Sequence, residues 1–141
     1  RISPTEIWES RNPWLVKRIE FAQDSCGAGK YRGGLGLDLE FEMLEETFVT
    51  TVVERTKFAP WGINNGESAR ANNVILKSNN KKINVPKKTG LRLHKGDTLI
   101  FQTGGGGGYG KSSERSKSKI LNDLKQGYIS KEYTKKYYPQ L

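Results

Sequence analysis

The sequence predicts an α+β fold: a mainly antiparallel, sandwich- or barrel-like β body followed by a C-terminal helical tail. Residues 37–43 alternate strictly between apolar and acidic side chains, which is typical of a strand with one face in water. Further short apolar and β-branched runs follow, separated by turn residues. After the glycine run at 104–110 the sequence changes to serine caps and an apolar stripe of helical spacing. We therefore expect a body at residues 1–110 and a tail at 111–141, packed in one domain.

The first two elements are a short helix and a strand. The capping box Ser3-Pro4-Thr5-Glu6 opens the helix, and Asn12-Pro13 ends it. Residues 15–21 form the strand, whose apolar side chains share one parity: Leu15, Ile19 and Phe21. A tight, partly buried bend is predicted at residues 23–29, which are rich in turn-forming residues.

The central strands are predicted from alternation and β-branching. Residues 47–54 are rich in β-branched side chains and are predicted to pair with residues 37–43 as a hairpin across Glu45-Glu46. Residues 58–66 look like an ordered loop because Pro, Gly and Asn interrupt them. The remaining strands are predicted at residues 73–77, 82–85 and 97–102, the first two as a hairpin.

Two helices are predicted in the tail. Ser112 or Ser113 caps the first, which runs through Gln126 with Gly127 as its C′ residue. Ser130 caps a second, short helix. The apolar stripe of the first helix consists of Ile120, Leu121 and Leu124.

The formal net charge of +9 suggests a nucleic-acid partner, but the distribution of the charge argues against one. Residues 111–141 hold eight basic and three acidic side chains, so much of the excess lies in the tail. The body has few aromatic residues among its basic ones and no groove-reading motif, which leaves only non-specific phosphate attraction. A non-catalytic basic module that binds nucleic acid stays as an alternative from another functional class.

The sequence contains no run of about 18 apolar residues and no apolar signal-peptide core, so we expect a cytoplasmic protein without a membrane segment. Cys26 is the only cysteine and His94 the only histidine, and the two are far apart in the sequence. These counts exclude an internal disulfide and a zinc site with the usual number of ligands. We therefore expect no metal site in this chain.

The glycine run at residues 104–110, Gly-Gly-Gly-Gly-Gly-Tyr-Gly, narrows the function more than any other segment. Glycine is kept where the backbone must approach something closely or adopt a positive φ. Residues 105–112 also match the spacing of a phosphate-binding P-loop. A P-loop, however, belongs to the first βα unit of a parallel α/β fold, and no strand-like segment follows here. A nucleotide-binding loop, a packed structural loop and a substrate-facing loop remain the three alternatives.

Five side chains are candidates for substrate binding: Asp24, Ser25, Arg32, Arg55 and Tyr109. Asp24 and Ser25 lie in the predicted bend and also suit turn capping, and no histidine lies near them for a triad. Arg32 and Arg55 could bind a carboxylate or phosphate through a bidentate fork, or Arg32 could pair with Glu40 or another acid. The glycine-loop positions grouped with Tyr109 are Gly105, Gly106, Gly107, Gly108 and Gly110. No residue is assigned a catalytic role.

The order of these motifs closely resembles the C-terminal part of the hydantoinase B family, over nearly the whole chain. That family includes the B subunits of N-methylhydantoinase, the corresponding half of 5-oxoprolinase, and related acetone and acetophenone carboxylase subunits. The sequence departs from the family at Cys26, Gly104 and Lys111-Ser112, where members usually have Gly, Pro and Asp-Pro. The last departure weakens the match to a P-loop. The segments that make up the resemblance are Asp24-Ser25-Cys26-Gly27-Ala28-Gly29-Lys30-Tyr31-Arg32-Gly33-Gly34-Leu35-Gly36, Arg55 with Pro60-Trp61-Gly62, Lys95-Gly96-Asp97, and the glycine run with Tyr109.

The resemblance implies that this chain is a C-terminal fragment or split subunit of an ATP-dependent cyclic-amide hydrolase. Its implied partners are the N-terminal part of the hydantoinase B chain and an ATP-binding hydantoinase A-type subunit. No cofactor is expected to bind this chain, whereas ATP and a divalent metal are expected elsewhere in the complex. A subunit of a related ATP-dependent ketone carboxylase is the alternative within the family.

Overall fold

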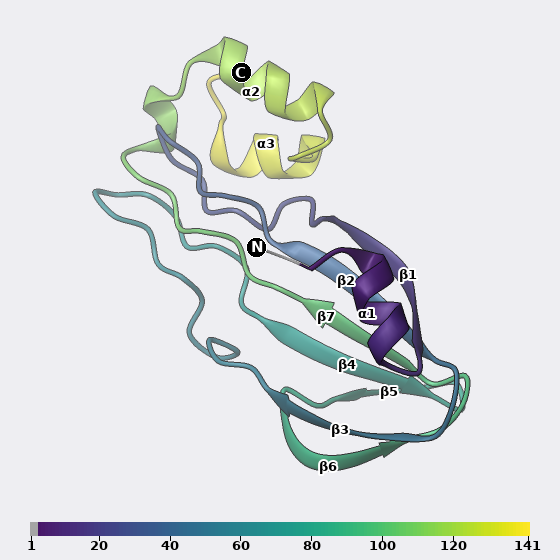
Figure 1. The fold of residues 1–141 in the computed structure, drawn as a ribbon. Coiled ribbons are helices and arrows are strands. Elements are labelled where there is room, and N and C mark those ends of the chain that lie inside the picture. Colours follow the sequence, from purple (N-terminus) through teal and green to yellow (C-terminus); the bar gives the residue numbers. More distant parts are fainter. Residues whose placement is uncertain (1–2) are drawn as a thin grey trace. The chain divides into compact units, whose positions relative to one another are not determined.

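The computed structural model describes residues 3–141, and the chain divides into two compact units (Figure 1). Unit 1 consists of Arg1–Glu20, Asp38–Glu54 and Asn73–Gln102, and unit 2 consists of Phe21–Leu37, Arg55–Asn72 and Thr103–Leu141. The predicted α+β class is confirmed: the sheets are mainly antiparallel, two α-helices lie at the C-terminal end, and the described residues form no closed barrel. No helix in this part of the chain is long and apolar enough to cross a membrane.

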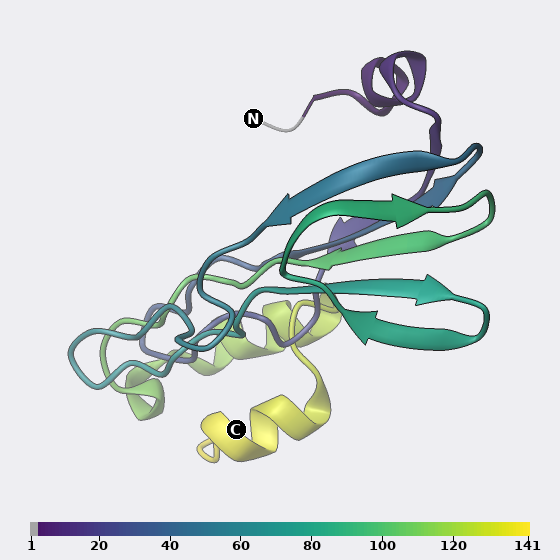
Figure 2. The ribbon, with the colours of Figure 1, turned by 90° about the horizontal axis from the view of Figure 1, so that it is seen from below.

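Unit 1 contains one helix and all the strands, apart from the last residue of β1 and the first residue of β2. Five strands form one sheet in the order β1-β2-β7-β4-β5, and β3 pairs with β6 in a separate two-stranded sheet (Figure 2). The pairs β2–β7, β4–β7 and β4–β5 are antiparallel, so the predicted hairpin of β4 and β5 is confirmed. The elements are α1 (Thr5–Arg11), β1 (Trp14–Phe21), β2 (Leu37–Met43), β3 (Thr47–Val52), β4 (Asn73–Ser78), β5 (Lys81–Asn84), β6 (Lys87–Leu93) and β7 (Thr98–Gln102).

The predicted hairpin between residues 37–43 and 47–54 is wrong. β3 instead pairs with β6, with Thr47 opposite Leu93 and Val52 opposite Lys87. A strand has only two edges, and those of β2 are occupied by β1 and β7, so β3 needs another partner. β6 gives no clear strand signal in the sequence, because its seven residues include three cationic side chains and a glycine.

The apolar face of β2 lies in the core of unit 1, as its alternation predicts. Leu39, Phe41 and Met43 are all buried. The Phe41 ring lies 5.4 Å from the ring of Trp8 and 5.5 Å from that of Trp14, in tilted arrangements that favour aromatic pairs. α1 and β1 therefore contribute one aromatic side chain each to the core around β2.

The apolar side chains that predict β1 lie on the exposed face of the strand. Leu15, Ile19 and Phe21 are exposed, whereas Trp14 and Val16 on the opposite parity are half-buried. The Trp14 ring packs on the core, and this contact decides which side of the strand turns inward. Both parities of β1 contain apolar side chains, so the sequence predicts this strand without deciding which of its faces is covered.

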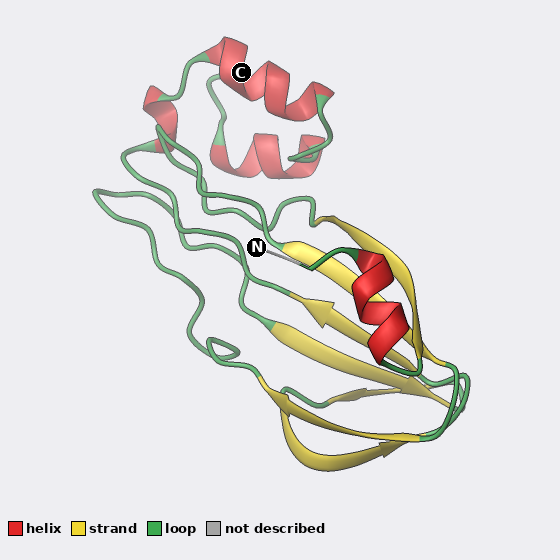
Figure 3. Ribbon diagram, in the orientation of Figure 1, coloured by secondary structure: helices red, strands yellow, loops and turns green. Residues whose placement is uncertain are grey.

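Among the described residues unit 2 contains no complete strand, and its centre is made of three extended segments that lie side by side (Figure 3). We call residues 25–36, 59–70 and 103–110 the glycine layer. Backbone hydrogen bonds join its third segment to the other two. The amide of Gly27 donates to the carbonyl of Gly106 (2.8 Å), and the amide of Gly108 donates to the carbonyl of Glu67 (2.9 Å). The backbone groups of these loops are therefore paired without regular β-ladders.

The tail forms the 3₁₀ turn η1 (Ser112–Glu114) and the helices α2 (Lys117–Lys125) and α3 (Lys131–Tyr137). The predicted cap at Ser112 or Ser113 is wrong, because α2 begins at Lys117. Arg115 interrupts the helix: its backbone is extended, with φ −71° and ψ 131°, and its side chain is buried against Asp123. A buried tertiary contact has thus overridden the local cap signal.

The apolar stripe predicted for α2 is correct at two of its three positions. Ile120 is buried and Leu124 is half-buried, but the side chain of Leu121 is exposed. Gly127 follows the helix with φ +72°, the left-handed conformation expected of a C′ glycine. Ile120 and Leu124, together with Ile129, pack into the core of unit 2.

Ser130→Ala is expected to lower the free energy of unfolding by about 1 kcal/mol. The Ser130 hydroxyl accepts a hydrogen bond from the amide of Tyr133 (3.0 Å), so the predicted cap of α3 is confirmed. Urea denaturation followed by circular dichroism measures the loss. Ser113→Ala is the matched control, because Ser113 is exposed within η1 and caps no α-helix. Equal losses in both variants would contradict this role of Ser130.

A buried thiol and two buried phenols share the core of unit 2. The Tyr133 hydroxyl donates to the carbonyl of Cys26 (2.7 Å), and the amide of Gly29 donates to the Tyr138 hydroxyl (3.3 Å). Burial raises the pKa of the Cys26 thiol and the pKa values of the Tyr133 and Tyr138 phenols above their ordinary values. All three groups therefore favour the protonated, neutral form in the folded chain.

The free energy of unfolding is expected to be level through neutral pH and to fall above about pH 8.5, where these groups begin to ionise in the unfolded chain. Their pKa values are higher in the folded state, so the stabilisation is complete below the unfolded pKa values and is lost as the pH rises. Each group that loses its proton only in the unfolded chain lowers the free energy of unfolding by about 1.4 kcal/mol per pH unit. Urea denaturation between about pH 7 and pH 10.5 measures it. Tyr133→Phe removes one of the groups, so a slope as steep as that of the unmodified chain would refute the explanation.

Candidate functional site

The glycine run lies at the centre of the glycine layer, where four of its amides donate hydrogen bonds to neighbouring backbone carbonyls. α2 begins only at Lys117, so residues 110–112 do not lead directly into an α-helix. A P-loop needs free amides and a helix N-terminus to hold a phosphate. This geometry argues against nucleotide binding by residues 105–112. The bonded pairs are Gly106 N to Gly34 O (2.9 Å), Gly108 N to Glu67 O (2.9 Å), Tyr109 N to Tyr31 O (2.9 Å) and Gly110 N to Ile63 O (3.0 Å).

The glycine layer has no room for side chains at most of its glycines. A Cβ on Gly108 would overlap the carbonyl oxygen of Ala28, and one on Gly33 would overlap that of Gly106. Within the run only Gly110 has a positive φ, of +73°. The run is therefore rich in glycine because backbone packs on backbone. Only its last position, Gly110, also needs glycine for a positive φ.

Tyr109 projects from this packed backbone into solvent, with 48% of the residue exposed. Its backbone pairs with Tyr31 in both directions, and the two rings lie 6.3 Å apart. The side-chain amide of Asn64 donates a hydrogen bond to the Tyr109 hydroxyl (2.7 Å). The phenol thus acts as an acceptor within the chain and keeps its own proton for another acceptor.

Exposed aromatic and aliphatic side chains surround Tyr109 on hydrogen-bonded segments. We call Tyr31, Trp61, Ile63 and Tyr109 the aromatic edge of unit 2; all four are exposed. Ile63 and Tyr109 form a parallel bridge, and the carbonyl of Trp61 packs against Gly107. Adjacent exposed side chains of this size are typical of a surface that contacts another molecule.

Arg55 begins the chain segment that leads to this loop, and it is held in an uncommon conformation. Its φ is +54°, in the left-handed region that favours glycine. Its carbonyl accepts a hydrogen bond from the amide of Asn72 (3.1 Å), and its guanidinium lies 5.2 Å from the centre of the Trp61 ring. Backbone strain of this kind is concentrated at functional positions, and the planar fork suits carboxylate or phosphate.

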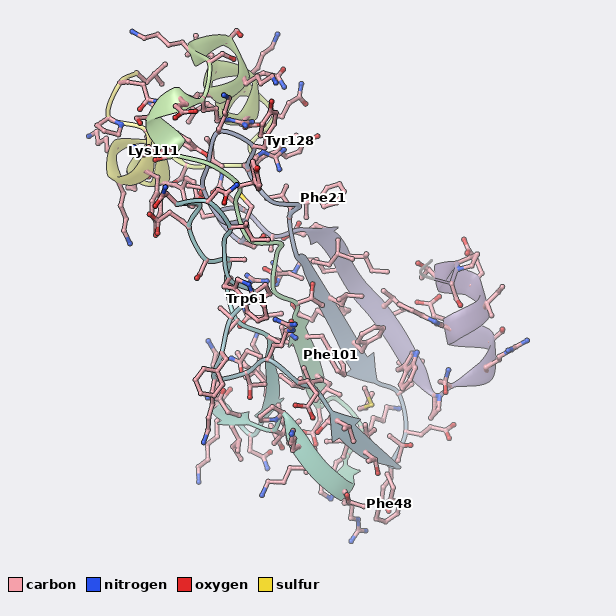
Figure 4. The ribbon with its side chains drawn as sticks, turned by 90° about the vertical axis from the view of Figure 1, so that its left-hand side faces the viewer. Phe21, Phe48, Trp61, Phe101, Lys111 and Tyr128 are labelled. Carbon is pink, nitrogen blue, oxygen red and sulfur yellow. The ribbon has the colours of Figure 1, made fainter. Side chains whose placement is uncertain are left out.

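Arg32 forms a buried ion pair, with Asp123 rather than Glu40. Its Nε atom lies 3.0 Å from the Asp123 carboxylate, and its guanidinium lies 5.2 Å from the centre of the Tyr128 ring. Glu40 belongs to unit 1, where it pairs with Arg18 and Lys77. Tyr128 also meets Phe21 edge-to-face at 6.3 Å (Figure 4). The contacts of Arg32 tie the glycine layer to α2.

Asp24 and Ser25 are bonded to backbone atoms in their bend. The Ser25 hydroxyl donates to the carbonyl of Ala22 (2.6 Å) and accepts from the amide of Gly36 (2.8 Å), and Ser25 is fully buried. The Asp24 carboxylate accepts from the amide of Ser130 (2.7 Å). In this arrangement both side chains position backbone, as turn-capping residues do.

All five candidate residues belong to unit 2, but the structure places them in two groups. Arg55 and Tyr109 flank the loop at residues 59–66, whereas the other three lie toward the helical tail. Asn64 is a member of the first group that the sequence reasoning missed. Its signal is the pair Asn64-Asn65, both with positive φ, because Asn tolerates that conformation and fixes the loop. Within residues 3–141 no group of three or more His, Cys, Asp or Glu could hold a metal ion.

Comparison with known proteins finds chains that are similar to this one in sequence and in structure. The family model described as Hydantoinase B/oxoprolinase matches residues 1–112. The B chain of a putative D-/L-hydantoinase of Pseudomonas sp. is 33% identical over 135 residues, which cover 94% of this chain and 23% of that protein. An ATP-dependent caprolactamase from Pseudomonas jessenii has a similar structure, with a TM-score of 0.83, 25% identity, and coverage of 94% of this chain and 24% of that one.

A nucleotide-free acetone carboxylase shares the fold with a TM-score of 0.82 and 18% identity, covering 98% of this chain and 23% of that one. The chain therefore spans about a quarter of the length of each of these three proteins. At this coverage the comparisons describe one part of a longer polypeptide in each relative.

Proposed function

This chain belongs to the hydantoinase B/oxoprolinase family, and on that premise we propose that it is the C-terminal part of a hydantoinase B-type subunit of an ATP-dependent cyclic-amide hydrolase. The family match confirms the resemblance stated from the order of the motifs. In the proposal this chain supplies structure and one wall of an active site that other segments complete. The observation that supports this role most directly is that two exposed polar groups, Arg55 and Tyr109, flank the loop at residues 59–66 of the hydrogen-bonded glycine layer.

The two polar groups have complementary chemistry. The Tyr109 hydroxyl is oriented by Asn64 and has a proton to donate, which suits the carbonyl oxygen of a cyclic amide. The Arg55 guanidinium stacks on Trp61 and suits a carboxylate or a phosphate. Because backbone contacts hold the run on several sides, Tyr109 is presented at a fixed position.

The remaining parts of the site are proposed to lie outside this chain. The proposed partners are the N-terminal part of the hydantoinase B chain and an ATP-binding A-type subunit, which is consistent with the name of the similar hydantoinase, itself one subunit of its enzyme. ATP and a divalent metal would bind elsewhere in that complex. The ATP-dependent caprolactamase, a hydrolase-type relative by its name, shares the fold at 25% identity and supports the same assignment.

The purified 141-residue chain is expected to show no ATP-dependent turnover of 5-oxoproline or hydantoin by itself. Activity should require the rest of the hydantoinase B chain together with an A-type subunit. An assay with acetone and bicarbonate, run in parallel, distinguishes the ketone carboxylase alternative from a hydrolase. Turnover of a cyclic amide by the isolated chain would show that the chemistry does not depend on the missing parts.

In the assembled enzyme, Arg55→Gly and Tyr109→Phe are each expected to lower kcat/KM on the order of 10- to 100-fold, because each removes one charged or oriented hydrogen bond. Glycine accepts the positive φ of Arg55, so the first variant removes the guanidinium without adding strain. Lys57→Gln is the control, since Lys57 is an exposed cation on the same segment. If Arg55→Gly lowers kcat/KM no more than Lys57→Gln, Arg55 has no role in the site.

A further inference from the structure

We propose that a pocket on α2 binds a small oxyanion, a phosphate or carboxylate group. The pocket has a volume of about 240 Å³ and is lined by Arg115, Ser118, Lys119, Asn122 and Asp123. These residues lie beyond the segment that the family model matches, which ends at residue 112. The proposal concerns a second site and does not rest on the proposed function.

The buried charged groups at the pocket are more positive than negative, although one of the cations, Arg32, does not line it. Arg115 Nη2 lies 2.7 Å from Asp123 Oδ2, and Arg32 Nε lies 3.0 Å from the same oxygen. Two guanidinium groups therefore share one carboxylate, while the next acid, Glu114, pairs with Lys30 (3.2 Å). One guanidinium charge is left without a carboxylate of its own in a poorly hydrated place, where the attraction for an anion is strongest.

The exposed part of the pocket offers hydrogen-bond donors. Ser118, Lys119 and Asn122 lie on one face of α2, three and four residues apart, and their side chains are exposed. The Lys119 ammonium lies 5.6 Å above the ring of Tyr31, and this contact directs it along one side of the helix. The lining thus offers a hydroxyl, an ammonium and an amide together with the buried guanidinium of Arg115.

The volume of the pocket limits the size of the anion that it can hold. A space of about 240 Å³ accommodates a phosphate or a carboxylate with a few attached atoms, but is below the usual range for whole cofactors. Asp123 is the one lining group that opposes an anion, and both arginines already occupy one of its oxygens. The attraction therefore comes from Arg115 and Lys119 in the lining, while Arg32 helps to compensate the charge of Asp123.

The test is an NMR titration of the ¹⁵N-labelled 141-residue chain with inorganic phosphate and, separately, with acetate, each at constant ionic strength set with chloride. We expect saturable shifts of the amides of residues 115–123 with at least one of the two anions. Saturation with phosphate alone assigns a phosphate site, and saturation with acetate alone assigns a carboxylate site. Shifts that stay linear with both anions would overturn the proposal.

Two charge variants distinguish a specific anion site from non-specific attraction to a basic helix. Lys119→Gln is expected to weaken anion binding about tenfold, because it removes one charged donor from the pocket. Lys117→Gln removes the same charge from the same end of α2, but Lys117 does not line the pocket. Equal weakening in both variants would show only non-specific attraction to a basic helix and would overturn the proposal. Both side chains are exposed, so both variants should stay folded.

Discussion

Gly108→Ala is expected to destabilise the chain by more than about 3 kcal/mol. A Cβ at this position would overlap the carbonyl oxygen of Ala28 and press on the neighbouring carbonyl of Gly27. Overpacking of a core costs about 1–3 kcal/mol when side chains can yield, and here the obstacle is buried backbone. The total stability of a domain is only about 5–15 kcal/mol, so the loss is a large fraction of it.

Gly34→Ala is the matched control for this substitution. Gly34 lies in the same glycine layer, but within residues 3–141 no atom beyond its own chain neighbours lies within 4 Å of the position of its Cβ. Its φ is not in the left-handed region, so alanine should change the free energy of unfolding by no more than about 0.5 kcal/mol. Urea denaturation of both variants measures the difference. If Gly108→Ala is tolerated as well as Gly34→Ala, the backbone packing described for the glycine run is incorrect.

Asp123→Asn is expected to cost about 3 kcal/mol. The Asp123 side chain is 5% exposed and is shared by Arg32 and Arg115, whose own side chains are 19% and 8% exposed. Removing the carboxylate charge leaves two neighbouring guanidinium groups without compensation, and breaking a buried ion pair in this way is strongly destabilising. The free energy of unfolding from urea denaturation measures the loss.

Glu114→Gln is the comparison for that loss. Glu114 pairs with Lys30 at 3.2 Å, but both side chains are about half exposed, so their pair should contribute less than about 1 kcal/mol. Addition of phosphate should restore part of the stability of Asp123→Asn, because an anion in the α2 pocket would replace the missing charge. A loss as small as that of Glu114→Gln would mean that the three groups are not coupled in the folded chain.

The structure confirms several predictions that depended on short stretches of sequence, although the capping box predicted at Ser3 and the cap predicted at Ser112 or Ser113 are wrong. The alternation over residues 37–43 predicts both the strand and the face that is buried. Gly127 and Ser130 mark the end of α2 and the cap of α3, because each acts on backbone groups within a few residues of itself. Local signals of this kind do not require knowledge of the rest of the fold.

The predictions that failed depended on partners distant in the sequence. β3 pairs with β6 because β2 has no free edge, and only the whole sheet shows this. Residues 112–116 do not extend α2, because Arg115 is buried against Asp123. In the sequence, Asp123 looks like an ordinary surface residue of a helix. Only the structure shows that Arg32, which lies far earlier in the chain, is 3.0 Å from it.

The sequence by itself determined the family, the α+β class and the importance of the glycine run, because composition, alternation and motif order are visible in a single chain. Only the tertiary structure decided what the run does. Its amides donate to two other segments and its missing side chains make room for their carbonyls, so its role is backbone packing that presents Tyr109. Such packing joins residues that are far apart in the chain, and a sequence pattern contains no record of which segments will meet.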